Sequence, residues 1–168
     1  LLFQFSKVNK IKILVLRLFN IMGHYEKYKI YSSNRGNVID EIILSINNNT
    51  HFTINSKYVG PNGSIRDFIH VEDVCNSNLM ALKFFKSKKK NYEILNIGSG
   101  KSISVRKLIK VFNKHIFNKI RYKNSYYKSG GQRKSFSNIE KSRKVIGWKP
   151  KKTIDDICIS EINGIKYM

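Results

Sequence analysis

The stretch that decides the fold reads Asn62-Gly63-Ser64-Ile65-Arg66-Asp67-Phe68-Ile69-His70-Val71-Glu72-Asp73-Val74. It opens with a turn signal, because Gly63 can adopt a positive φ and Asn62 tolerates tight turns. A short apolar run follows. Apolar residues then recur with the 3.6-residue period of a helix, at Val71, Val74, Cys75, Leu79, Leu82 and Phe85. The stretch therefore predicts a turn, a short apolar run and a helix whose apolar face consists of these residues.

Two charged side chains, Arg66 and Asp67, stand between the turn and the helix. A planar guanidinium that stays charged is well suited to hold a phosphate at such a position. Alternatively, the two side chains form an ion pair that caps the helix, and their spacing alone favours this second interpretation. His70, the one histidine of four that lies inside the motif, is expected to form a hydrogen bond at the helix entry.

Composition limits the class of protein. The chain has 168 residues, of which 41% are hydrophobic and 26% charged, as in a folded domain with a sizeable core. The formal net charge of +21 suggests a polyanionic partner. The lysines are scattered over expected polar faces and loops, however, so nucleic acid is not the expected partner. The chain opens on an apolar stretch without an initiator Met, and we expect it to be the back part of a longer protein.

Neither a membrane span nor a signal peptide is expected. No apolar run approaches the ~20 residues that cross a bilayer, and no leader pattern opens the chain. The two cysteines, Cys75 and Cys158, both fall on expected apolar helix faces, so we predict buried free thiols rather than a disulfide. Free thiols suit a reducing compartment, and the expected location is the cytoplasm.

Residues 11–19 form a nearly continuous apolar run rich in β-branched residues. Such a run predicts a strand buried on both faces, the kind found in parallel sheets. Asn20 and Gly23 close it, at the carboxyl end where open α/β sheets commonly bind their ligands. A plain turn residue is the favoured alternative for Asn20.

The rest of the chain alternates between expected helices, strands and loops. Helical periodicity is found over 38–46, over 105–116 behind a Ser104 cap, over 139–146, and from Thr153 onward behind a capping-box-like Thr153 and Asp156 pair. Extended segments are expected over 52–58 and 92–97, and loops over 24–36 and 121–136. Gly98-Ser99-Gly100 looks like a phosphate loop, but a strand-to-helix turn is the favoured interpretation.

The loop over 121–136 mixes cations with aromatic residues, among them Lys128. It is interpreted either as a platform that stacks a base and holds its phosphates or as a solvated loop, and the sequence does not separate the two. No nucleophile elbow, phosphate-binding Walker loop or metal-spaced His/Cys group occurs, so no metal is expected. The residues alone indicate the ligand-holding part of an α/β protein that has no chemistry of its own.

Four blocks in order resemble signatures of the UDP-glucose 4-epimerase family, within the NAD-dependent extended short-chain dehydrogenase/reductase enzymes. The blocks read Arg17-Leu18-Phe19-Asn20-x-x-Gly23, Gly63-Ser64-Ile65-Arg66-Asp67-Phe68-Ile69-His70-Val71-x-Asp73, Asn96-Ile97-Gly98-Ser99-Gly100-x-Ser102-x-Ser104-Val105, and Ile146-Gly147-Trp148-Lys149-Pro150. They cover nearly the whole chain but only the C-terminal half of the family. The resemblance implies the C-terminal part of a Rossmann-type, doubly wound α/β fold with a small substrate-binding α/β region.

The resemblance also implies a division of labour along the chain. Residues 1–23 would end the NAD-binding region, residues 24–168 would mainly bind a UDP-sugar, and 71–100 would pack back on the Rossmann sheet. The catalytic Tyr and Lys of a Tyr-x-x-x-Lys motif would precede Leu1, so no catalytic residue is expected here. The implied cofactor is NAD, the implied substrates are UDP-glucose and UDP-galactose, and the implied assembly is a homodimer of the full-length enzyme.

Site residues follow from the resemblance position by position. Phe19 would contact the nicotinamide end of NAD, Asn20 the diphosphate-sugar, and Asn37 the diphosphate. Phe52 and Ile54 would meet the uracil, Arg66 a phosphate, and Lys128 the phosphates from the late loop. That loop departs from the family, because Lys128-Ser129-Gly130-Gly131 replaces Arg-x-Gly-Asp and a point charge replaces a bidentate grip. Another nucleotide-sugar epimerase or dehydratase, or a non-catalytic polyanion-binding module, are the alternatives.

Overall fold

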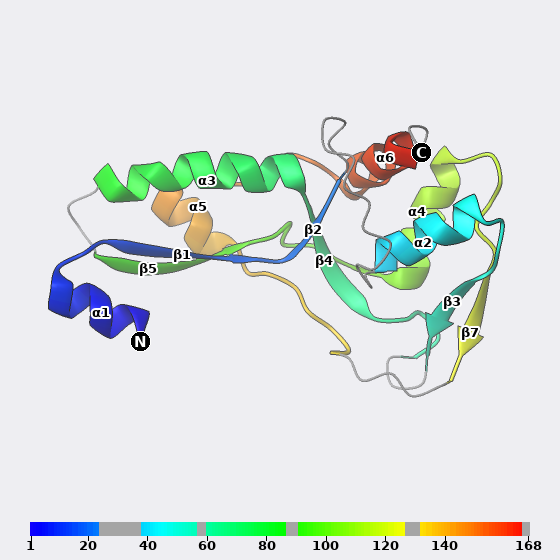
Figure 1. Cartoon of the computed structure of the whole chain (residues 1–168), viewed down its shortest axis with the longest axis horizontal. Helices are drawn as coiled ribbons and strands as arrows, with labels where there is room; N and C mark the ends of the chain where they lie inside the picture. The colour runs from blue at the N-terminus through cyan, green and yellow to red at the C-terminus, as the bar shows by residue number, and fades with distance from the viewer. Residues whose placement is uncertain (24–37, 57–59, 87–90, 127–131, 166–168) are drawn as a thin grey trace.

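The computed structural model describes residues 1–23, 38–56, 60–86, 91–126 and 132–165. Figure 1 shows an elongated molecule with two lobes, joined where β2 and β4 lie side by side. One lobe holds α1, β1, β5, α3 and α5, and the other holds α2, α4, α6, β3 and β7. The elements in chain order are α1 (Leu2–Asn9), β1 (Ile13–Leu18), β2 (Asn20–Met22), α2 (Val38–Asn47), β3 (Phe52–Asn55), β4 (Ile65–His70), α3 (Val71–Lys86), β5 (Tyr92–Ile97), β6 (Ser102–Ser104), α4 (Val105–His115), β7 (Tyr122–Ser125), α5 (Glu140–Ile146) and α6 (Ile154–Ile165).

The first lobe, here called the sheet lobe, is built on the parallel pair β1 and β5, whose register runs from Ile13 opposite Tyr92 to Leu18 opposite Ile97. The predicted strand and its parallel pairing are confirmed. Its predicted burial on both faces is wrong for the described residues, because no side chain of β1 is buried. The reason is that only β5 pairs with it in the described chain, so one edge and part of its surface are bare.

Helix α3 turns a different face to the core than its sequence predicts. Its buried residues are Asp73, Val74, Ser77, Ala81 and Phe84, which pack beside α5 and the strands of the sheet lobe. The predicted face is largely exposed, with Leu79 at 68% and Leu82 at 59%. Cys75 on that face is exposed as well, so its predicted burial is wrong, whereas Cys158 is buried and both thiols are free.

The second lobe, here called the small lobe, has a closed core. Helices α2, α4 and α6 pack with β3, β4 and β6 around a cluster that includes Ile42, Ile54, Phe68, Leu108, Phe112 and Cys158. The helix predicted over 105–116 is confirmed as α4, and the Ser104 hydroxyl accepts a hydrogen bond from the Lys107 N–H at 3.3 Å as the predicted cap. The predicted capping box of α6 is confirmed too, because Thr153 Oγ1 accepts from the Asp156 N–H at 3.2 Å.

Part of the predicted loop over 121–136 is a strand. β7 pairs in parallel with β3, with Phe52 opposite Tyr122 and Asn55 opposite Ser125. This strand could not be predicted from the sequence, because its residues are mostly polar and its partner strand lies far away along the chain. The predicted loop over 24–36 lies outside the described residues. Within the described part of the chain, no helix is both long and apolar enough to cross a membrane.

Candidate functional site

A cleft of about 630 Å³ opens at the carboxyl ends of β1 and β5. The strands stop together there, and the Phe19 N–H donates to the carbonyl of Ile97 at 2.9 Å. This is the edge where open α/β sheets bind their ligands. The cleft is lined by Arg17, Leu18, Phe19, Asn20, Asn96, Gln132 and Ser135. It therefore brings together two of the residues predicted from the sequence, Phe19 and Asn20.

Asn20 is held in place by the neighbouring strand. It begins β2, which pairs in parallel with β4, and its Nδ2 donates to the Asp67 carbonyl at 2.8 Å. The favoured alternative, a plain turn residue, is therefore wrong. The same side chain lines the cleft, so its amide oxygen is available as an acceptor at a fixed position.

Arg66 lies on β4, two residues before the position that pairs with Asn20. Its Nη1 donates to the carbonyl of Ile65 at 2.9 Å, and no carboxylate within the described residues forms a salt bridge with it. The interpretation of Arg66 and Asp67 as an ion pair is therefore wrong. The guanidinium is half-buried and keeps donors for a ligand.

One wall of the cleft runs directly beside Arg66. The Ile65 N–H donates to the Arg133 carbonyl, and the Ser135 N–H donates to the Ile65 carbonyl, both at 3.0 Å. The segment 132–135 thus follows the start of β4, and both Gln132 and Ser135 line the cleft. Phe19, Asn20 and the strand that carries Arg66 consequently meet at one place.

The turn at Gly98-Ser99-Gly100 serves the protein rather than a phosphate. The N–H groups of Ser99 and Gly100 donate to the carboxylate of Asp67, at 2.8 and 3.1 Å. These are the groups that a phosphate loop would offer to its ligand. Gly98 is required for space, because a Cβ there would lie 2.4 Å from the Ser137 hydroxyl and 2.9 Å from Asp67 Oδ2. The strand-to-helix interpretation fits, with the short strand β6 between the turn and α4.

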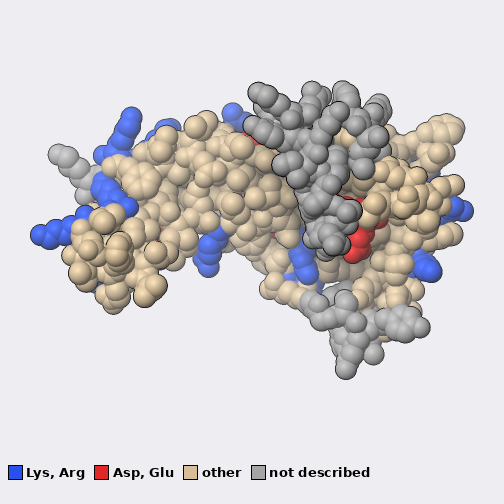
Figure 2. Space-filling model, viewed as in Figure 1, with Lys and Arg blue, Asp and Glu red and all other residues tan. Residues whose placement is uncertain are grey.

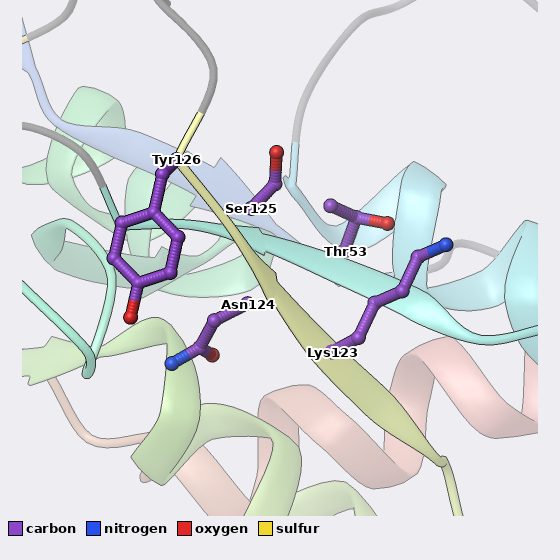
Figure 3. A pocket seen from close by; sticks show the side chains of 5 residues that line it. All are labelled: Thr53, Lys123, Asn124, Ser125 and Tyr126. Carbon is purple, nitrogen blue, oxygen red and sulfur yellow. The ribbon is translucent and has the colours of Figure 1, made fainter.

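The segment predicted to meet uracil is β3. The side chains of Phe52 and Ile54 are buried in the core of the small lobe, so only their backbone is open to a ligand. Between them, Thr53 lines a second pocket, of about 540 Å³, together with Lys123, Asn124, Ser125 and Tyr126 (Figure 3). Asn124 Oδ1 is buried there without a hydrogen-bond partner in the described structure.

Sequence reasoning missed several polar lining residues. Asn96 could have been found, because it opens the third block of the resemblance. Gln132, Ser135 and Asn124 carry no local signal, since their roles depend on pairing with Ile65 and with β3. Asn37 and Lys128, which were predicted from the resemblance, lie outside the described residues, as does Gly131. The contacts predicted for all the site residues stay predictions.

His70 has the structural role predicted for it. It ends β4 and is buried, and its Nδ1 accepts from the Glu72 N–H at 3.2 Å. Burial lowers the pKa of the imidazole below its ordinary value, which outweighs the opposing effect of Glu72. The imidazole also lies against Gly23, where a Cβ would come 2.8 Å from Nε2. Within the described residues, no three His, Cys, Asp or Glu side chains gather as metal ligands would.

A third pocket, of about 450 Å³, lies between the turn after β5, α4 and the start of α6. Six of its lining residues are cations, namely Lys101, Lys107, Lys114, Arg143, Lys151 and Lys152. Its one acid, Asp155, has a pKa lowered chiefly by its hydrogen bond to His115. Lys152 is paired with Glu72 at 2.9 Å, and that hydrogen bond raises the pKa of the lysine. The pocket is basic, and none of the predicted site residues lines it.

Comparison with known proteins identifies relatives of this chain in both sequence and fold. A bifunctional UDP-glucose 4-epimerase and UDP-xylose 4-epimerase from Arabidopsis thaliana is 30% identical over 159 residues, which make up 90% of this chain and 45% of that protein. The chain thus spans less than half the length of this curated relative. The fold matches a UDP-glucose 4-epimerase from Stenotrophomonas maltophila, solved with bound NAD and formylated UDP-arabinopyranose, with a TM-score of 0.88 at 21% identity, over 99% of this chain and 52% of that one.

A second solved enzyme gives the same picture. The UDP-glucose 4-epimerase from Bifidobacterium longum, in complex with NAD+ and UDP, matches with a TM-score of 0.78 at 23% identity, over 99% of this chain and 53% of that one. These likenesses confirm the predicted Rossmann-type α/β fold. The family model of the NAD dependent epimerase/dehydratase family matches residues 1–98, more than half of the sequence. The chain therefore belongs to the NAD dependent epimerase/dehydratase family.

Proposed function

We propose that this chain is the nucleotide-sugar-binding half of an NAD-dependent UDP-glucose 4-epimerase, which interconverts UDP-glucose and UDP-galactose through a 4-keto intermediate. The observation that carries the proposal is the cleft at the carboxyl ends of β1 and β5, where Phe19 and Asn20 meet the wall beside Arg66. The names of the relative and of the solved enzymes support the substrate class.

The residues of the cleft suit the two ligands of such an enzyme. NAD would supply the redox chemistry, accepting a hydride from the sugar and returning it to the other face. Phe19 would place its half-buried ring against the nicotinamide end, while Asn20 would bind the diphosphate-sugar through its fixed amide. The Tyr-x-x-x-Lys pair of the family is proposed to precede Leu1, so this half binds and orients rather than moves protons.

Arg66 is proposed as the main anchor of the diphosphate. During epimerisation the 4-keto sugar must turn over, so the site cannot grip the sugar throughout. The holding energy must come from the remote nucleotide, which keeps the reacting carbon near the cofactor. A guanidinium without a carboxylate partner in the described structure offers a phosphate two parallel hydrogen bonds.

The test is the affinity of UDP for variants of this chain within the completed two-half enzyme, measured by equilibrium dialysis of labelled UDP against low micromolar protein. Arg66→Ala should cost roughly 2–4 kcal/mol of binding, the scale for truncating a charge-paired group. Lys128→Ala should cost about 1 kcal/mol or less, because a lysine gives phosphate only a point charge.

The matched control is Arg121→Ala. Arg121 is an exposed arginine whose Nη2 donates to the Asn49 carbonyl at 3.3 Å in the small lobe. Its removal should leave UDP affinity unchanged. Equal losses for Arg66 and Arg121, or a larger loss for Lys128, would show that the diphosphate binds elsewhere. Failure of the unsubstituted two-half enzyme to bind UDP would refute the proposed substrate class.

The whole protein is proposed to be cytoplasmic, which the free thiols support. It is also proposed to act as a homodimer, which the family resemblance supports. Size-exclusion chromatography with light scattering on the full-length protein tests the assembly.

A second candidate function, binding of a polyanion, is favoured by one observation, the basic pocket beside α4. Lys101, Lys107 and Lys151 line it without any salt bridge in the described structure. Against it, Figure 2 shows the lysines and arginines of one face scattered rather than gathered in a patch. Binding of tripolyphosphate that is lost in Lys107→Glu and kept in Arg66→Ala would support this function. Equal loss in both would indicate the nucleotide cleft.

A further inference from the structure

The carboxylate of Asp67 is fully buried, at 0% exposure, and the proposed function gives it no role. Its Oδ1 accepts hydrogen bonds from the N–H and the hydroxyl of Ser99. Its Oδ2 accepts from the Gly100 N–H at 3.1 Å, and from the N–H and the hydroxyl of Ser137. A single side chain thus joins β4, the turn after β5 and the segment before α5.

Within the described residues, these five donors are the groups that stabilise the carboxylate. No lysine, arginine or histidine of the described structure forms a salt bridge with Asp67. A buried carboxylate is strongly unfavourable unless hydrogen bonds replace its hydration. The five donors supply that replacement, and the arrangement fixes all three segments to one point. Removing the acceptor would leave the N–H groups of Ser99 and Ser137 without a partner, while the Gly100 N–H would keep the Ser137 hydroxyl at 3.1 Å.

The two ends of this network reach the cleft. The backbone carbonyl of Asp67 accepts from Asn20 Nδ2 at 2.8 Å, which sets the amide of Asn20. Ser137 lies two residues beyond Ser135, whose own N–H is bound to the carbonyl of Ile65. Asn20 and Ser135 are far apart in the sequence, but both line the cleft. Asp67 is therefore connected to both, through its carbonyl on one side and its carboxylate on the other.

We propose that Asp67 is a positioning residue for the nucleotide site. It holds the segment 132–137 and Asn20 at the distance from each other that the nucleotide requires. It also fixes β4, so that the adjacent Arg66 lies beside that segment. Asp67 does not touch the ligand and acts through these residues. The inference rests on the proposed function, since it assumes that a UDP-sugar occupies the cleft.

The chain offers a matched control in Asp73. That carboxylate is 3% exposed, and it likewise accepts backbone hydrogen bonds from a distant segment, from the Lys151 N–H at 3.0 Å and the Lys152 N–H at 2.9 Å. Neither of its partners lines the cleft. Asp67→Asn and Asp73→Asn each replace a buried acceptor by an amide that faces N–H groups, so both are expected to lower stability.

The experiment compares UDP affinity with stability in the two variants. Affinity is measured by equilibrium dialysis of the completed two-half enzyme, and stability by urea unfolding followed through the fluorescence of Trp148. Asp67→Asn should weaken UDP binding by about tenfold or more, the factor that corresponds to one lost charged hydrogen bond. Asp73→Asn should lower the unfolding midpoint to a similar extent and leave UDP affinity within about twofold.

A milder pair of variants guards against misfolding of Asp67→Asn. Ser137→Ala and Ser99→Ala each remove one hydroxyl donor to the same carboxylate. Ser137→Ala should weaken UDP binding more than Ser99→Ala, because Ser137 belongs to the segment that lines the cleft. The inference is overturned if the unsubstituted two-half enzyme binds UDP while the two aspartate variants lose affinity equally, or while the two serine variants lose affinity equally. If the unsubstituted two-half enzyme does not bind UDP, the proposed function fails and the inference fails with it.

Discussion

Both lobes of the molecule have a buried apolar core, but some elements of the sheet lobe are far less covered than those of the small lobe. In the small lobe, α4 buries Val105, Leu108, Ile109, Val111 and Phe112 against α6 and the strands. In the sheet lobe, β1 buries none of its side chains, and α1 buries only Ser6. An apolar pattern in the sequence therefore indicates that an element packs against other protein. It does not show whether that other protein lies within the same 168 residues.

Helix α3 shows the same lesson within a single element. One face packs Val74, Ala81 and Phe84 into the sheet lobe, while Leu79 and Leu82 stand exposed on the other. A helix that is apolar on several faces is typical of one that is covered on several sides. The chain also spans only 45% of the Arabidopsis thaliana relative. The bare faces of α1, β1 and α3 are therefore the surfaces on which we expect further protein to pack.

The largest expected effect comes from covering these surfaces. The chain alone should self-associate, because an open strand edge and large exposed apolar faces promote aggregation. It should also show no turnover of UDP-galactose and carry no NAD through purification. Co-expression with the N-terminal half of the Arabidopsis thaliana relative should yield a monodisperse complex. Light scattering and an assay of UDP-galactose turnover measure both results.

The control for this experiment is co-expression with an unrelated soluble domain, which should not change the scattering of the chain. If the chain is monodisperse by itself and melts cooperatively, the exposed apolar faces of the sheet lobe do not need further protein to cover them. Measurable turnover by the chain alone would contradict the proposed location of the catalytic pair before Leu1.

A smaller effect is expected from the same Leu→Ala substitution made once in each lobe, with the loss of unfolding free energy as the quantity compared. Leu108→Ala removes a side chain with no exposure from the core of the small lobe and should cost about 2–5 kcal/mol of unfolding free energy. Leu16→Ala, on half-buried β1, should cost about 1 kcal/mol or less, because less apolar area leaves water on folding. Urea unfolding measures both. Equal costs would mean that the sheet lobe is as tightly packed as the small lobe.

Local signals in the sequence predicted local structure. The caps at Ser104 and Thr153, the helix of 105–116 and the strand of 92–97 all follow from residues close together in the chain. Long-range contacts could not be predicted this way. Asp67 finds its partners Ser99 and Ser137 at separations of 32 and 70 residues, so it was interpreted with its neighbour Arg66 instead.

The candidate site divides along the same line. The family resemblance selected Phe19 and Asn20, which line the cleft, and the strand of Arg66 beside it. It selected Phe52 and Ile54 without showing that both side chains turn into the core. The face of α3 was predicted wrongly because its apolar residues fit more than one helical stripe, and only packing against α5 decides between the stripes.

The smallest expected effect is a pH dependence at the junction of the lobes, where His70 ends β4 directly before α3. Burial lowers the pKa of His70 in the folded chain below the ordinary value of 6.5, so the unfolded chain binds more protons between the two values. Stability should therefore be complete above pH 6.5 and should fall as the pH drops from there through the lowered folded pKa. His70→Asn keeps a cap acceptor for the Glu72 N–H and removes the titration. The difference in unfolding free energy between the two proteins, measured from about pH 8 to about pH 5, should move in favour of the variant as the pH falls. A difference that stays constant would show that the imidazole exchanges protons freely in the folded state, and that the junction is open to water.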